Sequence, residues 1–209
     1  MSMRDHYKSN LRDTFFNLFE SLSLQDKLLG KTLFEDMDEA TIRGTIESYE
    51  QFCKKVIAPT NVDSDETPLK LDGEGNVTLP EPVNAAIKEF YKNEWFRLEL
   101  PAHLEGAGVG ATVSWACFEF LVGSNPCISF YAFNSLMAKT IDLLGTESQK
   151  KMFVGPMLER PWGATMVLTE PDAGSDVGNA RAKAKHIKDD IYHIEGVKRF
   201  ITNGDFNSV

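Results

Sequence analysis

The sequence W-G-A-T-M-V-L-T-E-P-D-A-G-S-D, at residues 162–176, indicates how the chain is organised on either side of it. Residues 164–168 form a short apolar run with β-branched members, which predicts a buried strand. Pro171 ends that strand, because proline cannot donate a hydrogen bond to a neighbouring strand. The small residues at 172–176 predict a loop whose amides and hydroxyl face a ligand such as a phosphate. A plain polar turn between strands would use the same residue types.

Before this stretch, apolar residues recur at the three- and four-residue spacing of helices. Asp38 can cap a helix that Pro59 ends, and Pro80 with Pro82 can open another. Residues 146–149 form a capping box and predict a further helix ending near Glu159. We therefore expect a bundle of about six helices. Their inward residues are expected to be Leu11, Phe15, Leu18, Phe19, Leu22, Ile42, Ile46, Tyr49, Cys53, Val56, Ile57, Val83, Ala86, Ile87, Phe90, Tyr91, Trp115, Phe118, Leu121, Val122, Ile128, Tyr131, Ser135, Leu136, Lys139, Leu143, Met152, Phe153, Met157 and Leu158.

Two segments of this helical half predict loops. Residues 61–76 are rich in acidic side chains and glycine, which indicates an exposed loop. Calcium is an alternative reading of the acidic residues, but D-G-E-G lacks the ligand order of an EF-hand. Residues 98–110 predict the second loop, where His103 has no second histidine or thiolate near it in sequence. We therefore expect no metal site.

After residue 162 the pattern alternates, as strands do. Arg181, Lys183 and Lys185 point one way, and residues 188–190 make a turn to a returning strand at 191–202. This pattern predicts a β-hairpin. The row of cations could face a phosphate, although the solvated face of an edge strand commonly carries such a row.

Composition excludes several classes of protein. The net charge of −9 and the sequence pI near 5.0 argue against a nucleic-acid partner. The three cysteines, Cys53, Cys117 and Cys127, form no CxxC pair and lie in apolar helical patterns, so reduced core thiols in the cytoplasm are expected. Residues 1–30 carry too many charges for a signal peptide or a membrane span, and a soluble protein is expected. Ser175 lacks the flanking glycines of a hydrolase nucleophile.

Three motifs, in this order, resemble the acyl-CoA dehydrogenase family of flavoproteins. They are G-T-E-S-Q-K-K at 145–151, L-T-E-P-D-A-G-S-D at 168–176 and G-V-K-R-F-I-T-N-G at 196–204. The opening H-Y-K-S-N-L-R-D at 6–13 is similar to the subgroup with a longer N-terminal arm, which includes broad-range and 3-methylmercaptopropionyl-CoA dehydrogenases. The resemblance covers nearly the whole chain.

The resemblance implies an α+β fold. Residues 1–161 would be the N-terminal all-α helical bundle, and 162–209 the opening strands of an incomplete middle FAD-binding β-domain, with the boundary near Pro161. In the family a C-terminal helical bundle follows and supplies the glutamate base. That bundle is expected to be missing here, so the sequence offers no catalytic residue and the chain alone is expected to be inactive. A non-catalytic helical binding or assembly module is the alternative function.

The resemblance also implies the cofactor and its contacts. FAD would contact Met166, Leu168, Thr169, Ser175, Phe200, Ile201 and Thr202, and Ser175 would also contact the acyl-CoA substrate. Asp172 replaces a common glycine and should point into solvent, because a carboxylate repels a pyrophosphate. Phe200 replaces a tryptophan, so it keeps ring stacking but loses an N–H donor.

The remaining implications concern substrate and partners. The small residues Ala132, Ser135 and Ala138 could leave room for an acyl chain or could serve ordinary helix packing. The family resemblance further implies a role in fatty acid metabolism, an electron-transfer flavoprotein or similar electron acceptor, and a homo-oligomeric parent protein.

Overall fold

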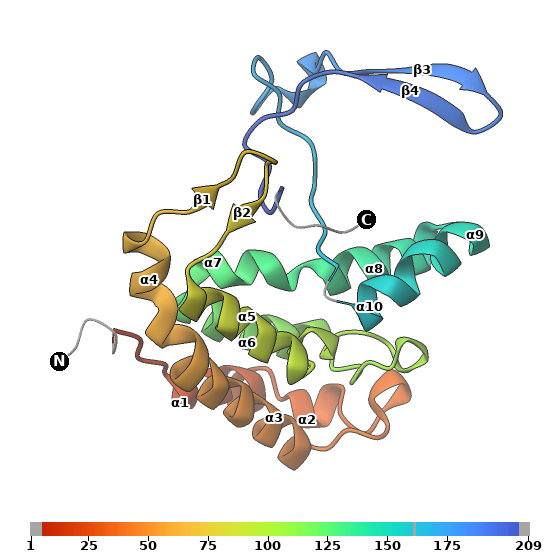
Figure 1. Ribbon diagram of the computed structural model, residues 1–209. Coiled ribbons are helices and arrows are strands. Elements are labelled where there is room, and N and C mark those ends of the chain that lie inside the picture. Colours follow the sequence, from red (N-terminus) through yellow and green to blue (C-terminus); the bar gives the residue numbers. More distant parts are fainter. Residues whose placement is uncertain (1–5, 161, 205–209) are drawn as a thin grey trace.

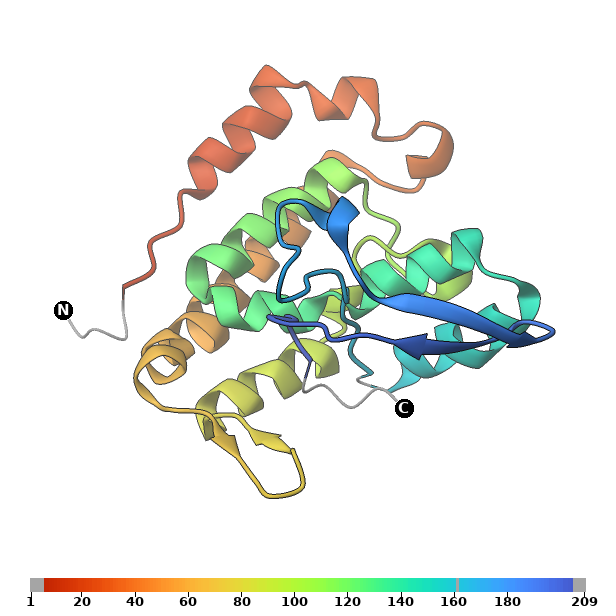
Figure 2. The same ribbon diagram turned by 90° about the horizontal axis from the view of Figure 1, so that it is seen from above.

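The computed structural model describes residues 6–160 and 162–204, in which layered helices lie beneath a smaller part built of strands and extended chain (Figure 1). Seen from above, the β3–β4 hairpin lies over α8 and α10 (Figure 2). The described helices are α1 (Leu11–Phe15), α2 (Leu24–Lys27), α3 (Glu39–Phe52), α4 (Asn61–Glu66), α5 (Glu81–Lys92), α6 (Ala111–Ser124), α7 (Pro126–Ser129), α8 (Asn134–Leu144), α9 (Glu147–Gln149) and α10 (Gly155–Glu159). The described strands are β1 (Lys70–Leu71), β2 (Val77–Thr78), β3 (Lys183–Lys188) and β4 (Ile191–Glu195).

The predicted helix starts are confirmed by their caps. The carboxylate of Asp38 accepts a hydrogen bond from the Thr41 amide at 2.7 Å, and α3 begins at the next residue. Thr146 and Gln149 form the predicted capping box at the start of α9. Asn125 ends α6, and its side chain caps α7 by accepting from the Cys127 amide at 3.0 Å.

The core lies where α3, α5 and α6 meet. The predicted inner faces of α3 and α5 are buried, with Ile46 and Cys53 completely inaccessible and Phe90 nearly so. Burial of a side chain of this size contributes about 1.5–3 kcal/mol. The helical half therefore holds together through one continuous apolar cluster.

The prediction that Pro59 ends the second helix is wrong. Helical turns continue through Cys53–Ile57 and Ala58–Thr60 into α4, so part of the predicted 61–76 loop is helical. Pro59 is tolerated because it lies in the first turn of a new helical segment, where an amide donor is not needed. The rest of 61–76 is exposed as predicted, with the short strands β1 and β2 paired antiparallel.

The predicted inward faces of α6 and α8 are wrong in part. Trp115 on α6 is 65% exposed and Leu143 on α8 is 77% exposed. The sequence of α6 is apolar nearly all round, so its spacing does not select one face. On α8 the buried residues are Asn134 and Ala138, whose small size lets α8 approach α10 closely. Other predicted core residues that lie exposed are Leu22, Val122, Leu136 and Met152.

The region after residue 162 contains the predicted hairpin, but residues 164–168 do not form the predicted buried strand. These residues are extended, and Met166 is 78% exposed. A strand is buried only when a sheet covers it, and within the described residues this segment has no regular ladder partner. Strand β4 ends at Glu195 rather than at 202. Pro161, where the sequence predicts the domain boundary, lies outside the described residues.

The hairpin itself pairs Ala184 with Ile194 and His186 with Tyr192, and every residue of both strands is exposed. Gly196 follows β4 at a point where the chain passes Ala182 so closely that a β-carbon would lie 2.6 Å from the Ala182 methyl group. Any larger residue at 196 would push the base of the hairpin apart.

Candidate functional site

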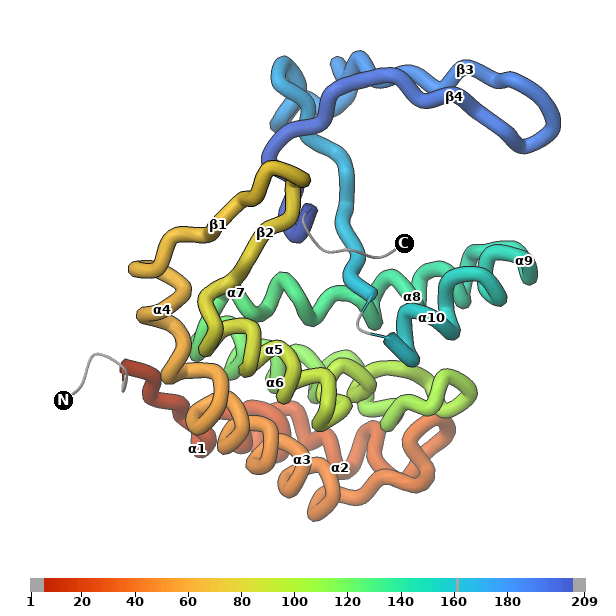
Figure 3. Tube along the Cα trace, in the orientation of Figure 1, coloured from red at the N-terminus to blue at the C-terminus, as the bar shows by residue number. Residues whose placement is uncertain are grey.

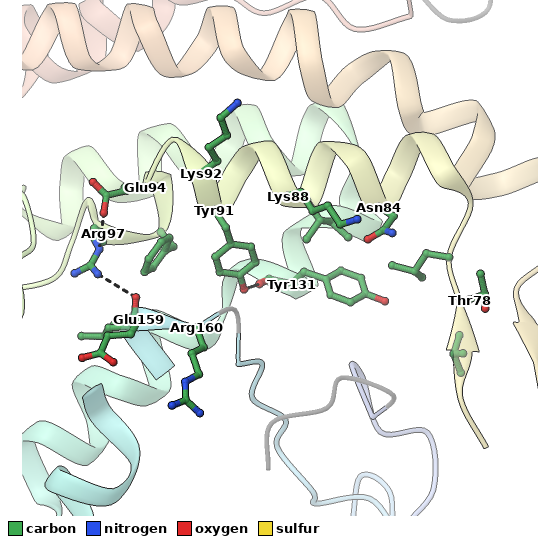
Figure 4. A pocket seen from close by; sticks show the side chains of 15 residues that line it. Thr78, Asn84, Lys88, Tyr91, Lys92, Glu94, Arg97, Tyr131, Glu159 and Arg160 are labelled. Atoms are coloured by element: carbon green, nitrogen blue, oxygen red, sulfur yellow. Dashed lines mark hydrogen bonds and ion pairs between the residues drawn. The ribbon is translucent and has the colours of Figure 1, made fainter. Parts of the chain in front are cut away.

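Two cavities formed by the described residues are candidate sites, and the larger is not the better candidate. It has a volume of about 830 Å³ and lies between β2, α5 and the end of α10 (Figure 4). Arg97 in its wall is already paired with Glu94 at 3.2 Å and donates to the Leu158 carbonyl at 3.0 Å. Figure 4 shows Tyr91 pointing toward Tyr131, to whose carbonyl oxygen its hydroxyl donates at 2.5 Å. No residue predicted from the sequence to bind a cofactor lines this cavity.

The second cavity, of about 400 Å³, contains two of the predicted cofactor contacts, Met166 and Thr202. One wall comes from α8 and the turn before it, and the other from the extended segment at 164–166 and the turn at 202–203. Such a volume lies within the usual range for small-molecule sites. The lining residues are Phe130, Phe133, Leu136, Met137, Thr140, Ala164, Thr165, Met166, Thr202 and Asn203.

The segment at 164–166 and the turn at 202–203 contact each other although more than 30 residues separate them in sequence. The chain between them, with the β3–β4 hairpin, can be followed in Figure 3. The Thr165 hydroxyl donates to the Thr202 carbonyl oxygen at 2.5 Å, and the Asn203 side-chain amide donates to the Ala164 carbonyl oxygen at 3.1 Å. Further along, the Arg199 amide donates to the Thr169 carbonyl oxygen at 3.0 Å. Two of these three bonds use side chains, which explains why the segments do not form a regular strand ladder.

Glu170 joins these segments to the hairpin. Its carboxylate is 6% exposed and accepts from the Lys198 ammonium at 2.9 Å and from the Arg181 and Ala182 amides at 2.5 and 3.0 Å. Hydrogen bonding to Lys198, together with the amide of Arg181, lowers the pKa of Glu170 to about 2. This carboxylate is therefore ionised at neutral pH, with all three donors directed at it.

The other predicted contacts lie outside the 400 Å³ cavity. Ser175 is exposed, Thr169 and Ile201 are half-buried, and Leu168 is half-exposed. Phe200 is 79% exposed, and the Arg199 guanidinium lies 4.5 Å from its ring centre. The roles of these residues stay predictions. Asp172 is exposed and pairs with Arg181 at 3.1 Å.

The cavity suits a flat ring with a polar edge. The α8 side is apolar, and the opposite side carries Thr202 and Asn203. The side-chain oxygen of Asn203 is buried and has no hydrogen-bond partner within residues 6–160 and 162–204, so an acceptor is left over at this edge. The isoalloxazine ring of a flavin combines an aromatic surface with hydrogen-bonding groups at one end, and these residues fit it. No cluster of metal ligands occurs among the described residues.

Sequence reasoning missed several residues of this cavity. Asn203 belongs to the quoted I-T-N-G motif, and its position beside Thr202 was a signal that could have found it. The α8 residues Phe133, Met137 and Thr140 were missed because the apolar spacing of α8 indicated the wrong face. Thr165 was assigned to a buried strand, whereas its side chain is exposed and bonds the second segment.

Comparison with known proteins agrees with this geometry. A family model described as "Acyl-CoA dehydrogenase, N-terminal domain" matches residues 40–160. The chain belongs to the acyl-CoA dehydrogenase family. The family resemblance and the α+β fold predicted from the sequence are thereby confirmed.

Among acyl-CoA dehydrogenases, this chain is similar to the broad-specificity linear acyl-CoA dehydrogenase FadE5 of Mycobacterium tuberculosis, with 42% identity over 96% of this chain and 33% of the relative. It is also similar to the 3-methylmercaptopropionyl-CoA dehydrogenase of Ruegeria pomeroyi, with 31% identity over 95% of this chain and 34% of the relative. These names match the subgroup that residues 6–13 resemble. The chain spans about a third of the length of both relatives.

A solved acyl-CoA dehydrogenase structure shares the fold. The butyryl-CoA dehydrogenase of Megasphaera elsdenii aligns with a TM-score of 0.60 and 25% identity, over 78% of this chain and 41% of that protein. Within the described part of this family member, no helix is both long enough and apolar enough to cross a membrane.

Proposed function

We propose that this chain forms the helical domain and part of the cofactor site of an FAD-dependent acyl-CoA dehydrogenase that introduces an α,β double bond into an acyl-CoA thioester. The observation that carries the proposal is the cavity in which Met166, two residues before the motif at 168–176, and Thr202, in the motif at 196–204, meet the wall of α8. When bound, FAD supplies the acceptor for the hydride that leaves the substrate β-carbon. Both relatives are acyl-CoA dehydrogenases, which supports the substrate class.

The residues of this chain would bind and orient the cofactor rather than take part in bond making or breaking. Phe133, Leu136 and Met137 give the cavity an apolar wall that excludes water from a bound ring. Thr202 and Asn203 give the opposite side hydrogen-bonding groups, and the Thr165–Thr202 hydrogen bond joins the two pieces of chain that make up that side. Preorganised groups of this kind stabilise charge that develops during reaction without having to move.

A smaller cavity supports one reading of the small residues on and near α8. Ala132 and Ser135 border a space of about 80 Å³ beside Phe118 and Trp95, whereas Ala138 is fully buried in helix packing. We assign Ala132 and Ser135 to the end of an acyl-chain path and Ala138 to packing. Ser175 remains our proposed contact to acyl-CoA.

We assign the proton-abstracting base to no residue in 6–160 or 162–204. Glu170 is held by three donors, and Glu99 is paired with Lys139 at 2.6 Å while accepting from the Ser114 hydroxyl at 3.1 Å. Residues 1–209 produced alone should therefore be inactive. They should also hold FAD poorly, because both strands of the hairpin, and Phe200, lie exposed. We further propose that the parent protein passes its electrons to an electron-transfer flavoprotein or similar acceptor, and that the parent protein is a homo-oligomer.

The test combines a mass spectrum with a visible absorbance spectrum of the purified protein that carries this sequence. We expect stoichiometric flavin, and we expect its absorbance near the visible maximum to fall when a saturated acyl-CoA is added without oxygen. Residues 1–209 alone serve as the comparison and should be colourless. A protein of verified mass that contains no flavin, or flavin that no acyl-CoA reduces, would contradict the proposed function.

A further inference from the structure

We propose that Glu170 is a positioning residue for flavin binding, whose carboxylate clamps the two cofactor-contacting segments and the hairpin into one arrangement. The proposal rests on the function proposed above. Glu170 itself does not line the cavity, so it would act through the residues that do.

Three separate pieces of chain converge on this one carboxylate. Glu170 lies four residues after Met166, in the motif at 168–176. The amides of Arg181 and Ala182, at the base of the hairpin, donate to its two oxygens, and the ammonium of Lys198 donates from the motif at 196–204. The Lys198 ammonium also donates to the Leu168 carbonyl oxygen at 3.0 Å, so it ties the two motifs together twice.

The clamp is the best-buried polar contact in this part of the molecule. Glu170 is almost inaccessible and the Lys198 side chain is 26% exposed, whereas the Thr165–Thr202 hydrogen bond lies at the surface. Hydrogen bonds to a charged group are worth roughly twice those between neutral groups, and water competes less where the group is covered. The exposed bonds between 164–165 and 202–203 therefore depend on the clamp to bring their partners within reach.

Burial of the carboxylate cannot be explained by the core. The apolar cluster of the helical half contains no residue beyond Ala164, and the neighbouring strands β3 and β4 are fully exposed. An ionised group is expensive to bury unless it is paired and hydrogen-bonded, and Glu170 meets this condition through the base of the hairpin and Lys198. Lys198 lies four residues before Thr202, which lines the cavity, so the pairing also holds the chain that leads to the cavity wall.

The experiment compares Glu170→Gln and Lys198→Met with two controls in the purified protein that carries this sequence. Lys198→Arg keeps the cation, and Asp172→Asn removes the exposed carboxylate that pairs with Arg181 in the same loop. The readouts are hydrogen exchange of the Arg181 and Ala182 amides, the dissociation constant for added FAD, and the urea midpoint of the helical signal.

We expect amide exchange to accelerate and the FAD dissociation constant to rise by about tenfold or more in Glu170→Gln and Lys198→Met. The urea midpoint should stay unchanged, because the clamp lies outside the helical core. Lys198→Arg keeps the cation that donates to Glu170, and Asp172→Asn removes only an exposed ion pair, which contributes little. Both variants should therefore stay within about twofold of the unmodified protein in every readout. The double variant that combines Glu170→Gln with Lys198→Met should lose no more FAD affinity than either single variant, because both single variants remove the same interaction.

Unchanged hydrogen exchange of the Arg181 and Ala182 amides, together with unchanged FAD affinity, in Glu170→Gln would overturn the proposal. A fall of the urea midpoint in proportion to the loss of FAD affinity would also overturn it, since Glu170 would then serve general stability. If the unmodified protein has no FAD affinity, the proposed function fails, and amide exchange still decides separately whether the clamp exists.

Discussion

The hydroxyl of Thr165 donates to the carbonyl oxygen of Thr202 at 2.5 Å and so joins the segment before the motif at 168–176 to the motif at 196–204, where both line the 400 Å³ cavity. Thr165→Val keeps the shape of the side chain but removes the donor. We expect the FAD dissociation constant to rise about threefold to tenfold, which corresponds to a hydrogen bond of roughly 0.5–1.5 kcal/mol. Thr45→Val removes a comparable exposed hydroxyl, which donates to the Thr41 carbonyl oxygen on α3, and should have no effect. Equal dissociation constants for the two variants in a fluorescence titration would count against the role of Thr165.

The buried face of α8 gives a second prediction. Ala138→Leu should destabilise the helical half by about 1–3 kcal/mol, because Ala138 is fully buried where α8 meets α10. Leu143→Ala should change the free energy of unfolding by less than about 0.5 kcal/mol, because Leu143 is largely exposed. Urea unfolding followed by circular dichroism measures both. The reverse ranking would mean that α8 presents to the core the face that its apolar spacing predicts.

The three thiols should differ in reactivity. Burial raises the pKa of Cys53 and of Cys117, the latter to about 12, while Cys127 lies exposed at the start of α7. A maleimide at pH 8 should therefore add one label to the folded protein, at Cys127, and three after unfolding. Peptide mass mapping identifies the site. Rapid labelling of Cys53 or Cys117 while the helical signal is intact would show that the α3–α6 contact is open.

Acid should release the Glu170 clamp only at low pH. The folded pKa of about 2 lies below the ordinary value of 4.5, so the interaction is fully present above pH 4.5 and is lost as the pH falls from there through 2. A carbon-13 titration of the Glu170 carboxyl group should have its midpoint near pH 2. The Arg181 and Ala182 amide resonances should shift with the same midpoint. A carboxyl midpoint at pH 4 or higher would show that Lys198 and the two amides are not bound to it in solution.

The helical fold was predictable where capping and spacing agree. Asp38 and Thr146 mark helix starts through local hydrogen bonds, and the stripe from Ile42 to Cys53 has only one apolar side. The faces of α6 and α8 were not predictable in the same way. The apolar residues of α6 surround the helix, and those of α8 indicate a face that is exposed, so packing against α3 and α10 decides which residues are buried.

The candidate site was predictable as two motifs but not as one cavity. The motifs at 168–176 and 196–204 are visible in the sequence, yet the approach of Met166 to Thr202 depends on Lys198, Glu170 and Asn203, whose hydrogen bonds join residues about 30 to 40 positions apart. The strand predicted at 164–168 is wrong for the same reason, because a short apolar run does not reveal whether a neighbouring strand exists to cover it.

An experimental density map of the flavin-containing protein is the most direct test of where the cofactor binds. We predict that the isoalloxazine ring lies in the 400 Å³ cavity, between α8 and the segment holding Thr202 and Asn203, with the Asn203 side-chain oxygen accepting a hydrogen bond. Flavin density in the 830 Å³ cavity beside Tyr91 and Arg160, or away from both motifs, would contradict this assignment.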